Sequence, residues 1–365
     1  MSRVAMTGAD GFLGFHTKAA LLEAGVIGEH IPVGDFFSLD SAMETLEGAE
    51  RFIHLAGVNR ASDAEVHDGN IRFAQQLADA LARVQNPPKV VVYANSIQAL
   101  NDSVYGKAKA EAGQILERAA ERIGAEFVDI RLPNLFGEHG KPFYNAVTST
   151  FCHLLATGEK PVVQDDKELT LLHAQNAADL LTGASDPADQ ASLEVTESVS
   201  GLLSRLEGIS KVYATGEIPD IAEAFNRDLF NTYRSYTFES LTPIKLTRHA
   251  DNRGSFFEII RAHGGPGQSS FSTTAPGISR GDHFHRRKVE RFTVLAGQAT
   301  ISLRKLFTDE VFDFEVTGDA PVAVDMPTFW SHKITNTSAN ETLYTSFWSN
   351  DIFDPEHPDT IAEAV

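Results

Sequence analysis

The chain has 365 residues, of which 42% are hydrophobic and 22% charged, so it is globular in composition and long enough for two domains of about 150 residues each. Its formal net charge of −19 at pH 7 argues against nucleic acid and anionic membranes as partners, because both require basic patches. Cys152 is the single cysteine, which excludes an intrachain disulfide, and with neither a leader nor an apolar span in the sequence we expect a cytoplasmic protein.

Residues 1 to about 226 alternate short apolar runs with longer amphipathic runs, which is typical of strands and helices around a parallel sheet. The pattern predicts an α/β fold. Apolar positions three and four residues apart mark the helices, and short continuous apolar runs mark the strands. The predicted strands are 3–7, 50–55, 89–93 and 126–131, and the predicted helices are 12–24, 71–84 and 105–122.

A glycine-rich segment, Thr7-Gly8-Ala9-Asp10-Gly11-Phe12-Leu13-Gly14, follows the first strand and opens the first helix. In a Rossmann fold such glycines permit a tight turn, let the backbone approach a pyrophosphate, and let helix and strand pack closely. The helix N-terminus adds amide donors and a favourable dipole. A glycine-rich turn without a ligand is the plainer alternative. The expected cofactor-binding residues here are Gly8, Asp10, Gly11, Phe12, Leu13 and Gly14.

The choice between NAD and NADP depends on the end of the second strand, where an acidic side chain favours NAD and a basic one favours NADP. Asp35 follows the apolar run Ile31-Pro32-Val33, and no arginine or lysine adjoins it in sequence. We therefore expect Asp35 to contact the cofactor, and by itself it favours NAD.

Tyr105 and Lys109 are four residues apart and so share one face at the start of a predicted helix. An ammonium group beside a phenol favours the phenolate, so this spacing predicts a lowered pKa for Tyr105 and proton transfer near neutral pH. A surface pair without a function is the alternative. Ser96, which follows the preceding strand, is expected either to orient a substrate carbonyl or to serve as a loop or N-cap serine.

Residues 1 to 235 resemble the extended short-chain dehydrogenase/reductase family, whose members act mostly on nucleotide sugars. Besides the two motifs, the likeness includes His54-Leu55-Ala56-Gly57, Asn70 and Arg131-Leu132-Pro133-Asn134-Leu135-Phe136-Gly137. It implies that Tyr105 is the general acid, that Lys109 assists it and binds the nicotinamide ribose, and that Ser96 orients the carbonyl. The segment between Ser96 and Tyr105 is short for such a member. The resemblance adds Leu55, Ala56, Gly57 and Asn70 to the expected cofactor site and Asn134 to the expected substrate site.

After about residue 236 the composition changes, and from residue 242 onward short β-rich runs alternate with Gly, Pro, Asn and Asp turns. This pattern predicts an all-β barrel or jelly roll of about 120 residues. We place the junction in residues 232–244, which divides the chain into an α/β domain over 1–240 and a β domain over 241–365. The predicted strands include 255–260, 291–295, 299–303 and 343–347.

Four residues of this β domain have the side chains that divalent metals prefer. His283 and His285 are two apart and so face the same side of a predicted strand, Glu290 follows, and His332 lies farther along. Three imidazoles and a carboxylate leave coordination positions open for substrate or water. We expect these residues to bind zinc, with nickel, iron and manganese as alternatives.

The region matches the first motif of the cupin superfamily through Gly277-Ile278-Ser279-Arg280-Gly281-Asp282-His283-Phe284-His285, Glu290 and Gly297. It matches the second motif through Pro327, His332 and Asn336, although Phe329 stands where a glycine is usual. The region also resembles the sugar-nucleotide 3,5-epimerases of deoxysugar pathways. That resemblance implies that Arg280 binds substrate phosphate. The histidine matching His283 is a catalytic base in those epimerases, but a metal ligand could not serve as a free base.

A reductase-like domain followed by a metal-binding cupin resembles the bifunctional reductase/epimerases that make the L-fucosamine precursor for bacterial capsule and O-antigen. Those enzymes act on UDP-2-acetamido-2,6-dideoxy-hexos-4-uloses. The resemblance spans almost the entire chain and implies that the cupin epimerises C3 before the Rossmann domain reduces the C4 carbonyl. It also implies NADPH as the cofactor, against the preference for NAD that Asp35 indicates, a UDP-linked keto-sugar as substrate, and a homodimer.

Two other functions are open at this point. A nucleotide-sugar 4-epimerase or dehydratase would use the same tyrosine and lysine but would recycle bound NAD, with the cupin as a structural domain. A non-catalytic protein that binds sugars or senses redox state is the second. The base that removes the C3 proton is open as well, with three candidates: His263, Lys288 and Tyr344.

Overall fold

The computed structural model describes residues 3–365, which divide into two compact units. The first unit holds the chain up to Leu135 together with Leu169–Thr196, and the second holds Phe136–Glu168 together with Glu197–Val365. Each unit is therefore built from two segments of the chain, and a domain boundary at residue 240 stays a prediction. No helix within residues 3–365 combines the length and the apolar character needed to cross a membrane.

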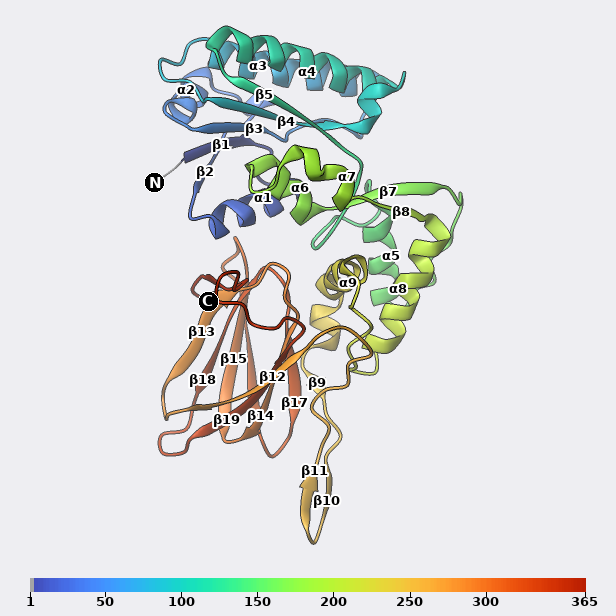
Figure 1. Ribbon diagram of the computed structural model, residues 1–365, viewed down its shortest axis with the longest axis vertical. Coiled ribbons are helices and arrows are strands. Elements are labelled where there is room, and N and C mark those ends of the chain that lie inside the picture. The colour runs from blue at the N-terminus through green and yellow to red at the C-terminus, as the bar shows by residue number, and fades with distance from the viewer. Residues whose placement is uncertain (1–2) are drawn as a thin grey trace. The chain divides into compact units, whose positions relative to one another are not determined.

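A five-stranded parallel sheet with the order β2-β1-β3-β4-β5 forms the centre of the first unit and confirms the predicted α/β fold. Figure 1 shows α3 and α4 on one face of this sheet and α1 and α6 on the other. The strands are β1 (Arg3–Thr7), β2 (Ile27–His30), β3 (Arg51–His54), β4 (Val90–Ser96) and β5 (Glu126–Leu132). The helices are α1 (Phe12–Glu23), α2 (Leu39–Leu46), α3 (Asp63–Leu81), α4 (Val104–Ile123), α6 (Ala174–Thr182) and α7 (Gln190–Leu193).

Shorter elements connect or follow these strands and helices. The 3-10 turns are η1 (Gly34–Phe36), η2 (Ile97–Leu100) and η3 (Pro187–Asp189). A small sheet with the order β6-β7-β8 consists of β6 (Asn134–Phe136), β7 (Glu168–His173) and β8 (Val195–Ser198).

Successive residues of the central strands fill two separate apolar layers. Phe52 and Val91 belong to the layer between the sheet and helices α2, α3 and α4, whereas Ile53 and Val92 belong to the layer that includes α1 and α6. Because both faces of a parallel sheet are covered, its strands are apolar without alternation. This is why the continuous apolar runs in the sequence locate these strands correctly.

Helix α3 begins at Asp63 rather than at the predicted residue 71. Ser62 Oγ accepts a hydrogen bond from the Glu65 N–H, and the Glu65 carboxylate accepts one from the Ser62 N–H. This capping box satisfies amides at the helix start. The first turns of α3 are largely polar and exposed, so the spacing of apolar residues predicts the helix too late.

Two five-stranded antiparallel sheets form the barrel of the second unit and confirm the predicted all-β domain. Their orders are β12-β19-β14-β17-β9 and β16-β15-β18-β13-β20, with Ile301, Leu303 and Val324 among the side chains of the core. The strands of the first sheet are β9 (Ile244–Lys245), β12 (Gln268–Thr274), β14 (Glu290–Ala296), β17 (Val322–Met326) and β19 (Leu343–Ser349). Those of the second are β13 (Ser279–Phe284), β15 (Gln298–Lys305), β16 (Val311–Thr317), β18 (Trp330–Asn336) and β20 (Ile361–Ala362).

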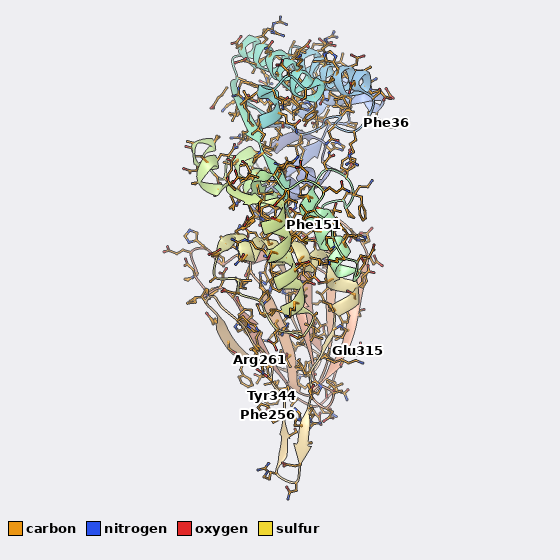
Figure 2. The ribbon with its side chains drawn as sticks, turned by 90° about the vertical axis from the view of Figure 1, so that its right-hand side faces the viewer. Phe36, Phe151, Phe256, Arg261, Glu315 and Tyr344 are labelled. Carbon is orange, nitrogen blue, oxygen red and sulfur yellow. The ribbon has the colours of Figure 1, made fainter. Side chains whose placement is uncertain are left out.

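A separate hairpin precedes most of the barrel strands. It consists of β10 (His249–Asp251) and β11 (Gly254–Phe256), and the Phe256 ring on it is 68% exposed (Figure 2). The chain after Phe256 is irregular. The predicted strand over 255–260 is therefore wrong beyond Phe256.

Helices α5 (Val147–Ala156), α8 (Val199–Tyr213) and α9 (Ala224–Leu241) belong to the same unit as the barrel. The predicted junction over 232–244 is mostly helix, because α9 runs through it. Phe238 of α9 packs on Trp330 with ring centroids 4.3 Å apart and belongs to the apolar core of the barrel. Residues before 240 therefore help to fill the barrel core.

A buried ion pair links the barrel to these helices. Arg291 on β14 donates to the two Asp325 carboxylate oxygens at 2.6 and 3.0 Å, with side chains only 1% and 3% exposed. Tyr213 of α8 also donates to Asp325, and Arg291 donates to the Gly216 carbonyl. Burial acts to raise the pKa of Asp325, but the Arg291 guanidinium holds it below its ordinary value. The pair is therefore charged in the folded protein.

Asp325→Ala should lower the free energy of unfolding of the barrel by about 3–5 kcal/mol, because it leaves the Arg291 guanidinium buried without its counter-charge. Both tryptophans of the chain, Trp330 and Trp348, lie on barrel strands, so their fluorescence during a guanidinium chloride titration reports this unit. Asp309→Ala, which removes an exposed carboxylate between β15 and β16, is the matched control. Equal midpoints for the two variants would show that the pair does not stabilise the barrel.

Candidate active site and metal centre

The glycine-rich segment forms a tight turn between β1 and α1. Gly8 has a φ of 69°, and a Cβ on Gly14 would lie 2.1 Å from the Gly8 carbonyl oxygen, so only glycine allows α1 to approach the turn this closely. Gly11 is the N-cap of α1 and has no side-chain oxygen that could accept hydrogen bonds from the first amides of the helix. An anion can accept these hydrogen bonds instead. The turn therefore fits a pyrophosphate. Phe12 and Leu13 lie in the first turn of α1, and Asp10 is exposed beside it.

Two polar side chains hold the loop that follows β3. Thr7 Oγ1 accepts hydrogen bonds from the N–H groups of residues 55 and 56. Asn70, which is 2% exposed, donates to the Val58 carbonyl and accepts from the Val58 N–H. Asn70 therefore fixes the shape of this loop, and its direct contact with a cofactor stays a prediction. The loop residues expected at the cofactor are Leu55, Ala56 and Gly57.

Asp35 does not lie at the end of a strand, because β2 ends at His30 and Asp35 belongs to the turn η1. The Arg72 guanidinium of α3 donates to the Asp35 carboxylate at 2.8 Å. Phe36, the next residue, is 86% exposed at the edge of the unit (Figure 2). The acidic residue that favours NAD in the sequence is thus paired with a cation that folding brings from a distant helix.

Helix α4 places Tyr105 in its first turn and Lys109 one turn later. Lys109 is 3% exposed, and its ammonium donates to the Ala94 carbonyl at 2.7 Å and lies 4.1 Å from the centroid of the Tyr93 ring. Burial lowers the pKa of Lys109 to about 7. Burial also raises the pKa of Tyr105, so the predicted lowering of that pKa is wrong and the phenol is protonated at neutral pH.

A row of buried side chains, which the sequence motifs do not predict, lies beside Lys109. The His54 and Tyr93 rings are stacked 5.5 Å apart at 12°, and His54 Nδ1 is 2.7 Å from Thr7 Oγ1. Burial, and then the charge of Lys109, lower the pKa of His54 to about 3, so this imidazole is neutral. Because Thr7 Oγ1 already accepts two amide hydrogen bonds, its hydroxyl donates a hydrogen bond to His54 Nδ1. Thr7 and His54 both belong to motifs quoted for the cofactor, but their pairing becomes visible only in the fold.

Ser96 ends β4, and its hydroxyl accepts a hydrogen bond from the Gln98 N–H at 3.2 Å, which caps η2. This bond does not use the hydroxyl proton, so the capping role is compatible with donation to a substrate carbonyl. Asn134 is exposed at the start of β6 and donates to the Thr170 carbonyl at 3.2 Å. The substrate roles of both residues stay predictions.

Because the pKa of Lys109 is lowered by folding, the free energy of unfolding should depend on pH. Between pH 7 and about 10.5 the unfolded lysine binds a proton that the folded one has released, so stability rises with pH across this window. Relative to Lys109→Met, the free energy of unfolding of the wild type should increase by up to about 1.4 kcal/mol for each unit by which the pH rises. Calorimetry of the cofactor-free proteins at pH 7 and pH 9 measures the difference. A difference independent of pH would show that Lys109 titrates normally.

The four expected metal ligands come together inside the barrel, with their ligand atoms all within 4.8 Å of one another. β13 carries His283, β14 begins with Glu290, and β18 carries His332. His285, which follows β13, is buried like Glu290 and His332, whereas His283 is half-buried. The imidazoles of the first motif, two residues apart, thus lie next to each other, with ring centroids 5.1 Å apart.

Backbone carbonyls hold two of the imidazoles in one tautomer, because a carbonyl can only accept. His285 Nδ1 donates to the Asp359 carbonyl at 2.6 Å, and His332 Nδ1 donates to the Trp330 carbonyl at 3.2 Å. Their Nε2 atoms lie 3.1 and 3.4 Å from the Glu290 carboxylate. Among the described residues the buried His332 Nε2 finds no hydrogen-bond partner. A metal ion would satisfy such an atom, so the group fits a divalent metal.

The charges of this group also fit a cation. Burial opposes ionisation of Glu290, but the His285 and His332 imidazoles beside its carboxylate hold its pKa well below the ordinary value. Burial lowers the pKa of His283 to about 4 and lowers that of His332 as well. At neutral pH the carboxylate is therefore charged and these two imidazoles are neutral, which is the state that binds metal.

Phe329, which replaces the usual glycine of the second cupin motif, keeps the backbone shape of a glycine. Its φ is 65°, a conformation that costs a residue with a side chain about 1–2 kcal/mol. The ring is fully buried, and the Phe329 N–H donates to the His285 carbonyl at 2.9 Å. Phe329 therefore does not remove His332 from the group of expected metal ligands.

A cavity of about 280 Å³ lies beside Glu290 in the barrel. Of the three candidates for the C3 base, Lys288 lines this cavity. Tyr344 stacks on Phe271, and His263 pairs with Glu217 at 2.6 Å, so both lie outside the lining. Other polar residues of the lining are Gln268, Ser270, Asp351, Asp354 and His357.

Arg280, which is expected to bind substrate phosphate, is exposed on β13. Its guanidinium donates to the Thr274 hydroxyl at 3.2 Å and to the Thr273 carbonyl at 3.0 Å. Both partners are uncharged, so its positive charge is not neutralised by them. The role of Arg280 stays a prediction.

Comparison with known proteins assigns both parts of the chain to known families. Residues 4–191 match the model of the NAD dependent epimerase/dehydratase family. The chain belongs to this family. Residues 249–361 of this family member match the polysaccharide biosynthesis C-terminal domain.

Similar proteins extend the likeness to the whole chain. A UDP-2-acetamido-2,6-beta-L-arabino-hexul-4-ose reductase of Pseudomonas aeruginosa is 31% identical over 100% of this chain and 99% of its own. The capsular polysaccharide assembling protein CapF of Staphylococcus aureus is 31% identical with a TM-score of 0.62, covering 99% of this chain and 100% of its own. A putative epimerase of Burkholderia cenocepacia, at 16% identity and a TM-score of 0.52, covers 65% of this chain and 98% of its own and shares the fold.

Proposed function

We propose that this chain epimerises C3 of a UDP-2-acetamido-2,6-dideoxy-4-keto-hexose in its barrel and then reduces the C4 carbonyl with NADPH, on the route to UDP-N-acetyl-L-fucosamine. The observation that carries the proposal is the similarity to the Pseudomonas reductase over the full length of both chains. The likeness to a capsular polysaccharide assembling protein supports the same route. The two sites described above supply the groups that each step needs.

For the reduction, the nicotinamide supplies the hydride that reduces C4. Tyr105, which is protonated at neutral pH, donates its phenolic proton to the carbonyl oxygen as the alcohol forms. The Lys109 ammonium stabilises the phenolate that remains. The Ser96 hydroxyl orients the carbonyl, and the Gly8 turn holds the pyrophosphate.

For the epimerisation, the neighbouring C4 carbonyl acidifies the C3 proton, and a divalent metal, when bound, would supply Lewis-acid stabilisation of negative charge. The ligands would be His283, His285, Glu290 and His332, and zinc suits this set. Lys288 lines the cavity beside Glu290, where it can remove the C3 proton without net oxidation. A proton from solvent, added to the opposite face of the sugar, then completes the inversion at C3. Arg280 would hold the diphosphate.

Arg72 supports NADPH as the cofactor. Its guanidinium neutralises the Asp35 carboxylate, and a guanidinium in this region can also bind the 2′-phosphate that distinguishes NADPH. The assembly that we expect for the working enzyme is a homodimer.

Tyr105→Phe should lower the rate of NADPH oxidation with the keto-sugar by on the order of 10²- to 10⁴-fold, because it removes the proton donor and keeps the ring. Exchange of the C3 proton with deuterated solvent should persist, since the metal group is intact. Absorbance and proton NMR of the full-length protein measure the two reactions. Tyr233→Phe, which removes a phenol that pairs with Ser210, is the control.

Loss of C3 exchange together with reduction in Tyr105→Phe would assign both steps to the Rossmann site. Turnover without net consumption of NADPH would instead indicate an epimerase or dehydratase that recycles its cofactor. Parallel assays with NADH test the choice of cofactor.

The purified wild type should contain one divalent ion per chain, and His285→Ala should contain almost none, because it loses a buried ligand. The variant should also lose C3 exchange yet reduce a substrate that already has the product configuration at C3. Elemental analysis and the same assays measure this, with the half-buried His67→Ala, a histidine of the other unit, as the control. Equal metal content in wild type and His285→Ala would exclude this group as the metal site.

A further inference from the structure

Asp359, close to the C-terminus, contacts the segment between two of the metal ligands without being a ligand itself. Its carboxylate accepts hydrogen bonds from the N–H groups of Arg286 at 3.0 Å, Arg287 at 2.9 Å and Lys288 at 2.8 Å. Its backbone carbonyl accepts the His285 Nδ1 proton at 2.6 Å. One residue therefore binds four consecutive residues of the chain.

These bonds fix the turn that separates His285 from Glu290. Three successive amides converge on one carboxylate, which is a favourable arrangement for a negative charge. Asp359 is only 7% exposed, so if its carboxylate were removed, water could not easily replace it as the hydrogen-bond acceptor of these amides. The carboxylate thereby sets the path of the chain between one ligand and the next.

The Asp359 backbone is held in an unusual conformation. Its φ is 37°, which residues other than glycine seldom adopt. The carboxylate bonds hold the residue in this conformation, and the conformation directs its carbonyl at the His285 ring. Side chain and backbone of Asp359 thus act together on the same ligand.

The chain after Asp359 is paired with the strand of another ligand. β20 lies antiparallel to β13, with Ala362 opposite His283. The Glu363 N–H donates to the Asp282 carbonyl, and the Glu363 carboxylate pairs with Arg304 at 2.7 Å. The last residues of the chain are therefore part of the wall around the metal ligands.

We propose that Asp359 is a positioning residue of the metal centre, one that sets the tautomer and direction of His285 and its spacing from Glu290. This role rests on the metal site proposed above. It makes metal affinity depend on the C-terminal segment, which contributes none of the four ligands.

Metal affinity measured without substrate tests this role. The metal-free full-length protein is titrated with Zn²⁺ in competition with a chromophoric chelator. Asp359→Ala should bind Zn²⁺ 10- to 100-fold more weakly than wild type, the usual effect of losing such a supporting contact. Asp359→Asn, which keeps one acceptor oxygen, should lose less. Asp309→Ala, on an exposed turn of the same barrel, should match the wild type.

A second measurement separates positioning from a general loss of stability. The visible spectrum of the Co²⁺-loaded protein reports ligand geometry, and it should change in Asp359→Ala and not in Asp309→Ala. Tryptophan fluorescence checks that the barrel is folded. If Asp359→Ala fails to fold, the Zn²⁺ affinity of Asp359→Asn tests the positioning role instead. Weaker Zn²⁺ binding by Asp359→Asn than by the wild type would support this role.

Wild-type affinity and an unchanged Co²⁺ spectrum in a folded Asp359 variant would overturn the positioning role and leave the metal site standing. Absence of Zn²⁺ binding by the wild type would overturn the metal site and this role with it. The two failures are therefore distinguishable.

Discussion

The carboxylate of Glu290, buried among three histidines, is the constraint that the polar interior of the barrel has to satisfy. A buried charge is tolerated only when other groups compensate it, and here imidazoles and a metal ion can do so. Arg291, the next residue of β14, points to the opposite face and meets Asp325. One strand thus carries two buried charges of opposite sign, one among the three histidines and one that attaches the helices.

The two sites are built on the same physical principle. Each keeps an ionisable group out of water, where its proton affinity changes, and each uses backbone carbonyls to orient it. The Ala94 carbonyl accepts a hydrogen bond from the Lys109 ammonium. The carbonyls of Asp359 and Trp330 accept hydrogen bonds from Nδ1 of His285 and of His332, respectively. A carbonyl on a strand or turn is fixed by the fold, so it orients a reactive side chain more firmly than another mobile side chain would.

The sequence predicts most of the architecture because the relevant patterns are local. Apolar runs locate the strands of the parallel sheet, and the glycine segment predicts its turn. The start of α3 is predicted too late because a capping box marks it, and the spacing of apolar residues does not. The strand over 255–260 is overextended because β propensity continues after the partner strand of the hairpin has ended. The sequence predicts a junction over 232–244, whereas α9 packs Phe238 into the barrel there. Local sequence patterns cannot predict this contact, because its partners are far apart in the chain.

The sequence alone determined which residues are candidates for the two sites: the glycine turn, the pair of Tyr105 and Lys109, and a set of three histidines and one glutamate. These signals lie in residue type and short spacing, which the chain carries before it folds. Only the tertiary structure decided the proton affinities and the supporting contacts. The raised pKa of Tyr105, the pairing of Asp35 with Arg72 and the bonds of Asp359 to the ligand turn all depend on burial or on residues far apart in the chain. Burial and long-range proximity exist only once the chain has folded.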